Sequence, residues 1–209
     1  MLRGLTAILA MLTAPAQAHP HLFVDADVAL VYEAGTLRAV RLTWTYDEFF
    51  SLLLTEDLGL DPDMDGQLTG AERATLSDAV LDWPEGYEGD LYVTQGGRPV
   101  QLGARQDASV AFEDGQVIER HTRPVAAAAP GDATVRVYDP GYYTAYTVVT
   151  PVTVTGNAAC TAQVRRADLI AATEKVDELL YGMPQDEAEV AFPEVGKDFA
   201  DTIRVSCGG

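Results

Sequence analysis

The chain has 209 residues, a formal net charge of −18 and a mean hydropathy close to zero. A surface this acidic repels phosphate backbones and anionic lipids and attracts cations, so a nucleic-acid partner is excluded. The length suits one large domain or two small ones and is ample for a buried hydrophobic core.

Residues 1–18 predict an export signal. Arg3 supplies a positive start, Leu5 to Leu12 an apolar run, and Ala16-Gln17-Ala18 a small-x-small cleavage site. The apolar run is too short to span a bilayer, and no later stretch approaches the roughly eighteen apolar residues that a transmembrane helix requires. We therefore expect a periplasmic mature chain that begins at His19 and has no transmembrane segment.

The first elements of the mature chain differ in period. Residues 21–46 alternate between apolar and polar, which predicts a β-hairpin with a turn at Ala34-Gly35. One face of its first strand would carry Val24, Ala26, Val28 and Leu30. Residues 47–59 then predict a helix that Asp47 caps and Gly59 ends. Its broad apolar face would contain Phe49, Phe50, Leu52, Leu53 and Leu54. A second helix is expected at 69–81.

The following part of the chain is rich in predicted strands. Hairpin turns are expected at Gly96-Gly97, Asp114-Gly115 and Pro140-Gly141, because each pair stands between alternating arms. A third helix is expected at 168–181. Its inner side would carry Leu169, Ile170, Val176, Leu179 and Leu180.

The last residues are acidic and weakly patterned and end in a short predicted strand at 202–206. No internal repeat, low-complexity tract or long linker divides the chain. We therefore expect a single α+β domain over 19–209, antiparallel β-rich and sandwich-like, with one C-terminal helix and an EF-hand-like helix-loop-helix inserted at about 47–82.

The two cysteines are Cys160 and Cys207. In an exported protein a disulfide is the default, and this one would close a loop of about 46 residues and stabilise the fold by roughly 3 to 4 kcal/mol. The alternative, a cysteine metal site, would need closer spacing.

Residues 61–72, DPDMDGQLTGAE, match the ligand spacing of an EF-hand calcium loop. Such a loop supplies oxygens from positions 1, 3, 5, 7, 9 and 12, with glycine at position 6 for the turn. The corresponding residues are Asp61, Asp63, Asp65, Gln67 through its carbonyl, Thr69 and Glu72, with Gly66 at the turn. The loop also lies between two predicted helices, as the motif requires. We expect bound Ca²⁺, and an acidic surface loop without an ion is the alternative.

Two features depart from the usual motif. Arg73 follows Glu72 where an apolar residue is usual, which predicts a different packing of the exit helix. No second loop of this form is present. A lone EF-hand in an extracellular compartment is usually a structural clip of modest affinity, so we expect the working function elsewhere.

Two of the three histidines, His19 and His21, stand at the expected mature N-terminus. The square-planar amino-terminal copper and nickel motif is excluded, because Pro20 has no amide proton to lose. What remains is a chelate of the α-amino group and the His19 imidazole, with a second imidazole from His21 or from His121 on the predicted strand QVIERHTRP. Such ligands suit Zn²⁺, Ni²⁺ and Cu²⁺ alike. An added oxygen could come from Asp25, Asp27 or Glu119. The alternative is a frayed terminus with His121 facing water.

The sequence does not mark an enzyme. It has no G-x-S-x-G elbow and no glycine-rich phosphate loop, and both cysteines are expected to be oxidised. The aromatic segment YDPGYYTAY at 138–146 would be a binding platform or, more commonly, a turn with cross-strand tyrosine pairs.

Four segments together resemble one bacterial family. They are the opening AHPHLFVDA, the stretch LTWTYDEFFS, the single EF-hand-like loop and the later YDPGYY. Over nearly the whole mature chain they are similar to the family catalogued as domain of unknown function 1007, which is described as a periplasmic component of an ABC-type transport system. Its members are associated with nickel/cobalt-type transporters and zinc-responsive genes, so the resemblance implies an accessory role in transition-metal transport. The matching positions are His19, His21, Trp44, Asp47, Phe49, Phe50, Asp139 and Tyr142.

We therefore expect a periplasmic, non-enzymatic protein that binds Ca²⁺ at 61–72 and a transition metal at the amino-terminal histidines. Its partner would be a membrane metal transporter, to which it delivers the ion or for which it senses the ion. The competing hypothesis is a calcium-stabilised module whose aromatic strand face docks a protein or a glycan. A solute-binding protein is less favoured, because the chain lacks the length and βαβ alternation of two lobes.

Overall fold

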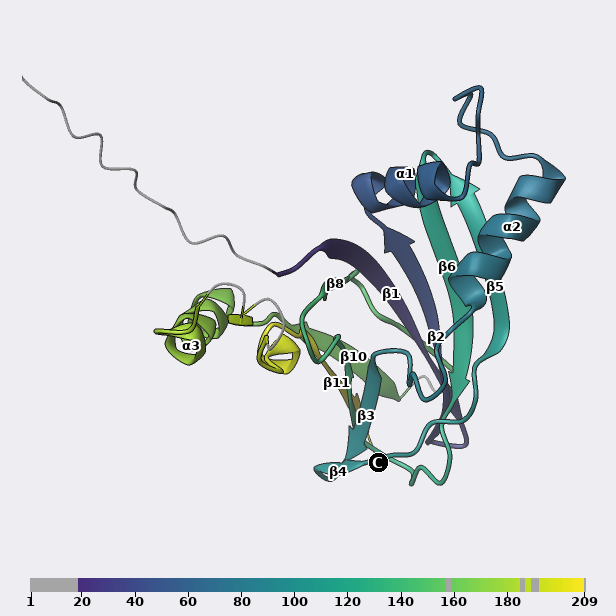
Figure 1. Cartoon of the computed structure of the whole chain (residues 1–209). Coiled ribbons are helices and arrows are strands. Elements are labelled where there is room, and N and C mark those ends of the chain that lie inside the picture. The colour runs from purple at the N-terminus through teal and green to yellow at the C-terminus, as the bar shows by residue number, and fades with distance from the viewer. Residues whose placement is uncertain (1–18, 157–158, 185–186, 189–191, 209) are drawn as a thin grey trace, which may run out of the picture.

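The computed structural model describes residues 19–156, 159–184, 187–188 and 192–208. The expected leader at 1–18 lies outside the described residues. Within them the chain forms two β-sheets, two helices beside the first sheet and a further helix, α3, near the C-terminal strand (Figure 1). None of the helices in this described part is long and apolar enough to cross a membrane. The predicted α+β class, rich in antiparallel β-structure, is confirmed.

The first sheet has the strand order β5-β6-β2-β1-β8, and β9 also pairs with β1. Its strands are β1 (Leu22–Glu33), β2 (Thr36–Tyr46), β5 (Gln106–Glu113), β6 (Gln116–Pro124), β8 (Thr144–Val148) and β9 (Thr153–Thr155). The pairs β1–β2, β2–β6 and β5–β6 are antiparallel, whereas β8 and β9 run parallel to β1. The expected hairpin turns at Ala34-Gly35 and Asp114-Gly115 are confirmed, and all four residues have the positive φ that such turns require.

The second sheet has the order β10-β11-β7-β3-β4 and is antiparallel throughout. Its strands are β3 (Leu91–Gln95), β4 (Arg98–Pro99), β7 (Ala133–Val137), β10 (Cys160–Arg165) and β11 (Thr202–Cys207). The turn at Gly96-Gly97 joins β3 to β4 as predicted. The hairpin expected at Pro140-Gly141 is wrong, because the chain leaves the second sheet after β7 and adds β8 to the first sheet, parallel to β1.

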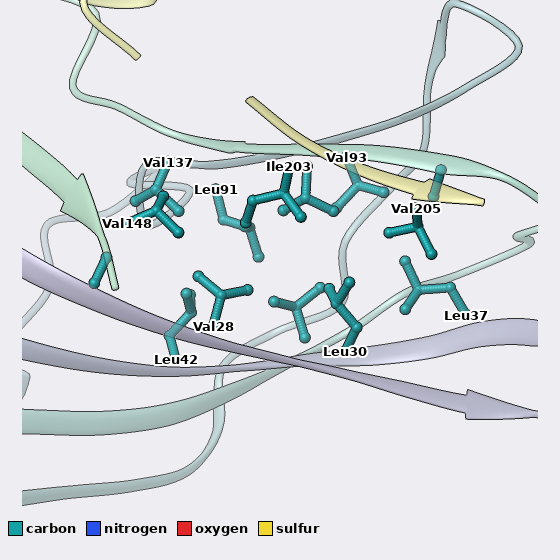
Figure 2. Close-up of a cluster of buried hydrophobic side chains, with 14 of the residues drawn as sticks. Val28, Leu30, Leu37, Leu42, Leu91, Val93, Val137, Val148, Ile203 and Val205 are labelled. Atoms are coloured by element: carbon teal, nitrogen blue, oxygen red, sulfur yellow. The ribbon is translucent and has the colours of Figure 1, made fainter. Parts of the chain in front are cut away.

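The two sheets pack their apolar faces against each other (Figure 2). The predicted inner face of β1 is buried, with Val24, Ala26, Val28 and Leu30 almost fully shielded from solvent. The second sheet contributes Leu91, Val93, Ile203 and Val205 to the same core (Figure 2). Burying each such side chain stabilises the fold by roughly 1.5 to 3 kcal/mol. A slip of one residue in β1 would turn its whole apolar set outward, so the core fixes the register.

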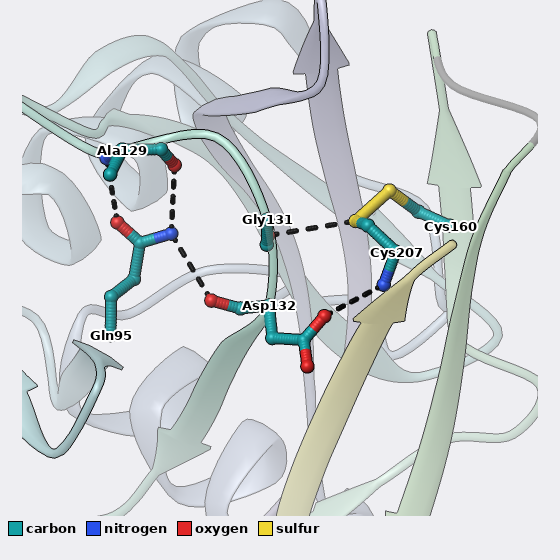
Figure 3. Close-up of a disulfide and its surroundings, with 6 residues drawn as sticks. All are labelled: Gln95, Ala129, Gly131, Asp132, Cys160 and Cys207. Carbon is teal, nitrogen blue, oxygen red and sulfur yellow. Dashed lines mark hydrogen bonds between the residues drawn. A yellow bond between two sulfur atoms is a disulfide. The ribbon is translucent and has the colours of Figure 1, made fainter. Parts of the chain in front are cut away.

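The predicted disulfide between Cys160 and Cys207 joins β10 to β11 (Figure 3). The two cysteines are direct cross-strand partners, and their Cα atoms are 4.0 Å apart. The N–H of Cys207 donates to the carboxylate of Asp132, and the Gln95 side chain holds the adjoining segment through two hydrogen bonds with Ala129 (Figure 3). The bond therefore ties the C-terminal strand into its sheet, as suits an exported protein.

The helices α1 (Glu48–Asp57) and α2 (Gly70–Leu81) flank the 61–72 loop and cover the β5–β6 side of the first sheet (Figure 1). Asp47 caps α1 by accepting from the N–H of Phe50, and Thr69 and Glu72 form a capping box at the start of α2. A second buried cluster lies between these helices and the sheet. Its members are Leu60, Leu68, Leu76 and Val117.

The predicted apolar face of α1 is wrong in part, since of its five residues only Phe50 and Leu54 pack against the buried clusters. Phe49, Leu52 and Leu53 are exposed, whereas Ser51 and Thr55 are buried. A hydrogen bond to the sheet accounts for this orientation, because the Ser51 hydroxyl accepts from the N–H of Val117 at 2.9 Å. Turning α1 to bury its phenylalanine and leucines would leave that buried N–H without a partner.

The predicted inner face of the C-terminal helix is wrong in part. Helix α3 (Leu169–Leu180) buries Val176, as expected, but its other buried residue is Ala172. Leu169, Ile170 and Leu179 are exposed. The helix lies near the edge of the molecule (Figure 1), so a narrow strip of small residues is enough to dock it.

Candidate metal centres

The 61–72 segment, called the calcium loop from here on, gathers three carboxylates. One oxygen each from Asp61, Asp63 and Asp65 lies within 4.8 Å of the others. The Asp61 carboxylate accepts from the N–H groups of Asp65 and Gly66, each at 3.0 Å, which folds the loop back on its first predicted ligand. The N–H of Gln67 donates to Asp65 at 2.7 Å. This oxygen-rich turn has the donor chemistry that Ca²⁺ prefers.

Glu72 closes the loop. One of its carboxylate oxygens accepts from the N–H of Asp61 at 3.2 Å and the other from the N–H of Thr69 at 2.7 Å, so position 12 lies against position 1. Hydrogen bonds to the side chain and backbone of Thr69 lower the pKa of the Glu72 carboxyl. It is therefore ionised at neutral pH. As the bidentate ligand of position 12, Glu72 would exchange these hydrogen bonds for the ion.

Arg73, the residue that departs from the motif, has a local role. Its guanidinium donates to the carbonyl of Leu68, whose side chain is buried beneath the loop. The exit helix is thereby tied to the loop by a hydrogen bond where an EF-hand usually has an apolar contact.

His19 and His21, called the histidine pair from here on, lie side by side before β1. Their ring centroids are 5.0 Å apart and their planes are inclined at 71°. The His19 ring stacks on Phe192 at 4.0 Å, and the His21 ring packs on Tyr143 at 4.6 Å. The N–H of His21 also donates to the carbonyl of Tyr143 at 2.9 Å. Three distant parts of the chain therefore hold the two imidazoles together.

The spacing of the histidine pair suits one shared ion. Two imidazole nitrogens that each lie about 2.0 to 2.1 Å from a metal place their ring centres about 5 Å apart. Nδ1 of His19 is buried without a hydrogen-bond partner among the described residues. Burial and the neighbouring His21 lower the pKa of the His19 imidazole, against an opposing effect of Asp139. The neutral form that a metal requires therefore predominates at pH 7.

The structure does not bring His121 to the histidine pair. In the first sheet His121 is paired with Leu42, and Leu42 with Val28. Val28 follows His21 by seven positions along an extended chain, which corresponds to roughly 23 Å. His121 is therefore too distant to supply the second imidazole, and His21 is the histidine that accompanies His19.

His121 is instead enclosed in the interior. Its side chain is 2% exposed and meets the rings of Trp44 and Trp83 edge-on, at 4.7 and 5.0 Å. Nδ1 lies 3.1 Å from a carboxylate oxygen of Glu119, which is itself fully buried. Of the three suggested oxygen donors, Glu119 thus accompanies His121, and Asp25 and Asp27 are exposed on β1.

The sequence reasoning did not identify the residues that position the histidine pair. Tyr143 and Phe192 contact the rings, and the Asp139 carboxylate, close enough to influence His19, accepts from the N–H groups of Gly141 and Thr144. Outside the three loop aspartates, the described residues contain no group of three or more acidic, histidine or cysteine side chains suited to one ion. A third donor to the pair would therefore be the α-amino group expected at His19.

The tyrosines of the 138–146 segment contact different elements. Tyr138 stacks on Tyr92 in β3, Tyr142 stacks on Phe199 before β11, and Tyr146 packs on Trp44 in β2. Tyr143 is the one that reaches the histidine pair.

The sequence matches a family model. No curated protein matches the sequence. A family model described as a protein of unknown function, DUF1007, matches residues 4–207, and this range includes the histidine pair, the calcium loop and the disulfide. The description specifies no activity. The chain belongs to the DUF1007 family.

Proposed function

We propose that this exported protein binds a transition metal, Zn²⁺, Ni²⁺ or Cu²⁺, at the histidine pair and delivers it to a membrane metal transporter. Ca²⁺ in the calcium loop stabilises the fold. The observation that supports the proposal most directly is the 5.0 Å separation of the His19 and His21 rings, which are braced by Phe192 and Tyr143. The proposed role is binding and transfer of the ion, without catalysis.

Exposure of the ligands supports transfer of the ion. His21 is exposed and His19 half-buried, so an incoming ligand from a partner has access to one side of the ion. A site with an open coordination position can exchange its metal, whereas a closed four-ligand site cannot do so readily. The acidic surface attracts cations and raises their local concentration. Salt screens this attraction beyond about 8 to 10 Å.

An exposed apolar surface adjoins the histidine pair and suits a docking partner. The N–H of Asp47 donates to the carbonyl of Phe23, and the N–H of Phe23 donates to the side-chain carboxylate of Asp47, so β1 meets the start of α1 at Phe23. Phe23 on β1 and Phe49, Leu52 and Leu53 on α1 are all exposed. Surface patches of this kind mark interaction sites. Phe23 stands two residues from His21, so a transporter docked here would lie next to the ion.

The proposal is tested by calorimetric titration of calcium-saturated protein that begins at His19 with Zn²⁺, Ni²⁺ and Cu²⁺. We expect His19→Ala and His21→Ala each to lower the affinity by about 100-fold, because each removes an imidazole ligand. One extra residue before His19 would weaken binding if the α-amino group is a ligand. His121→Gln is the matched control and should leave the affinity unchanged. Equal affinities in the unaltered and His21→Ala proteins would contradict the proposal.

Delivery is tested separately from binding. The variant Phe49→Ser with Leu52→Ser removes apolar side chains from the exposed surface and leaves both histidines in place. We expect it to bind metal normally but to lose transfer to membranes containing the transporter. Loss of metal binding in this variant would mean that the exposed surface supports the site itself rather than docking.

A further inference from the structure

A pocket of about 290 Å³ opens between the α1–α2 helices and β8. Its aromatic wall consists of Trp44, Tyr46, Phe50, Trp83, Tyr87 and Tyr146. Among the described lining residues the one charged side chain is that of Asp82. Ligand pockets usually measure about 300 to 1,000 Å³, so this aromatic pocket suits a compact molecule.

Three wall tyrosines donate their hydroxyl groups to buried carboxylates. Tyr87 and Tyr146 both donate to the same oxygen of Asp90, each at 2.8 Å, and Tyr46 donates to Glu119 at 3.3 Å. Asp90 is 7% exposed and Glu119 is fully buried. A hydroxyl that donates to an anion leaves more electron density on its ring, so the negative faces of these rings are strengthened.

The charges behind the pocket are not balanced. Glu119 has a cationic partner in Arg105, at 3.5 Å, and the Arg105 guanidinium lies 4.0 Å from the centre of the Trp83 ring. The Asp90 carboxylate accepts from the hydroxyls of Tyr87 and Tyr146, and among the described residues no cationic side chain forms an ion pair with it. Burial raises the pKa of Asp90 to about 6. A cation in the pocket would supply the missing positive charge.

One wall residue also lacks a polar partner. The indole Nε1 of Trp44 is buried and has no hydrogen-bond acceptor among the described residues. Buried indole N–H groups normally find an acceptor. A cationic ligand with a hydroxyl or carbonyl oxygen a few bonds from its charge could accept from the Trp44 indole N–H and also supply the positive charge that Asp90 lacks.

We propose that the aromatic pocket binds a small organic cation, an alkylated ammonium on a short oxygen-bearing chain. Electron-rich ring faces attract such ions, and recognition of quaternary ammonium groups by aromatic cages relies on this attraction. The site is separate from the histidine pair and the calcium loop, and it goes beyond the proposed metal function.

The two tryptophans of the chain, Trp44 and Trp83, both line this pocket, so intrinsic fluorescence reports its occupancy. The full mature protein, loaded with Ca²⁺, is titrated with choline and with 3,3-dimethylbutan-1-ol, called dimethylbutanol below. This alcohol is the neutral analogue of choline in which carbon replaces the ammonium nitrogen. We expect choline to bind at least about 10-fold more tightly than the alcohol. Equal binding would show a merely apolar cavity, and no change with either compound would show that nothing of this class binds. Either result overturns the proposal.

Two variants test whether the preference for choline over the alcohol arises at the aromatic pocket. Asp90→Asn keeps a hydrogen-bond acceptor at a residue with a φ of 48°, which asparagine tolerates, and removes the charge. It should reduce the preference for choline over the alcohol by several-fold. Tyr181→Phe, at an exposed tyrosine outside the pocket, is the control and should change nothing. If Asp90→Asn fails to fold, the comparison of choline with dimethylbutanol on the unaltered protein still tests whether the pocket prefers a cation.

Discussion

The calcium loop draws its six predicted ligands from residues 61–72, whereas the histidine pair is held in place by residues from two distant parts of the chain. In the loop, the Asp61 carboxylate is bonded to N–H groups four and five positions away. In the pair, His21 packs on Tyr143 from the β7–β8 connection, and His19 stacks on Phe192 from the segment before β11. One site is defined by local chain geometry and the other by the tertiary fold.

This difference predicts which site each perturbation affects. A change that loosens the packing of the two sheets against each other should weaken the histidine pair before it affects the calcium loop, because hydrogen bonds within residues 61–72 hold the loop ligands. A change of one loop ligand should leave the histidines unaffected. Every following prediction therefore measures both affinities, for Ca²⁺ and for the transition metal, on the same variant.

Removal of the disulfide should have the largest effect. The double variant Cys160→Ser with Cys207→Ser is expected to lower the free energy of unfolding by about 3 to 4 kcal/mol, measured by urea denaturation. Because β11 follows the segment that carries Phe192, we also expect weaker transition-metal binding and unchanged Ca²⁺ binding. Unaltered protein with its disulfide reduced is the matched control. A parallel loss of Ca²⁺ affinity would erase the distinction between the two sites.

Glu72→Gln is the complementary change. It removes the charge of the bidentate ligand, and we expect the Ca²⁺ affinity to fall by at least about 100-fold, as measured by calorimetry. Transition-metal affinity at the histidine pair should stay within about twofold, since the two sites share no ligand. Asp78→Asn on the exposed face of α2 removes a charge outside the loop and should affect neither site. A large effect of that control would mean that general acidity, rather than loop geometry, binds the ion.

The parts of the fold that the sequence predicted correctly depend on local rules. Alternation in β1, the turn pairs Ala34-Gly35, Gly96-Gly97 and Asp114-Gly115, and the caps of α1 and α2 each involve residues a few positions apart. The pairing of β8 with β1 was missed, because a Pro-Gly pair between alternating arms has the same pattern whether the arms pair with each other or separate.

Strand β6 shows why His121 was misplaced. Its buried positions include Glu119, His121 and Arg123, although polar residues at alternate positions normally mark the solvent face. His121 packs against the rings of Trp44 and Trp83, and the other two bond to groups outside β6. Glu119 bonds to Tyr46 and Arg105, and Arg123 donates to the carbonyls of Gly103 and Glu88. The inner face of β6 depends on these tertiary partners, which a sequence pattern does not reveal.

A shift in pH should separate the two sites. A metal competes with protons for its ligands, so transition-metal affinity falls as pH drops through the pKa of the His19 imidazole. The pKa of His19 lies below its usual 6.5, and that of Glu72 lies below its usual 4.5. Between pH 7 and pH 5 we expect the transition-metal affinity to fall by at least about 10-fold while Ca²⁺ affinity changes little. Calorimetric titrations with each metal at both pH values measure the two changes in affinity. An equal loss of affinity at the two sites would contradict the prediction.

Phe192→Ala should have the smallest effect and is the finest test of the comparison. The phenylalanine ring stacks on His19 at 4.0 Å and contributes no ligand atom. Its removal frees the imidazole to rotate, so we expect the transition-metal affinity to fall by about 3- to 10-fold, in the range of a residue that orients a ligand. The readout is calorimetric titration with Zn²⁺ beside a Ca²⁺ titration.

Phe199→Ala is the matched control for this change. Phe199 stacks on Tyr142 at 3.9 Å, so the variant loses a similar aromatic contact nearby without touching a histidine. If the tertiary frame acts on the pair specifically through the His19–Phe192 stack, Phe192→Ala weakens metal binding more than Phe199→Ala at equal loss of stability. If the two variants weaken it equally, general loosening of the C-terminal segment is sufficient, and the stack on His19 has no separate role in orienting the ligand.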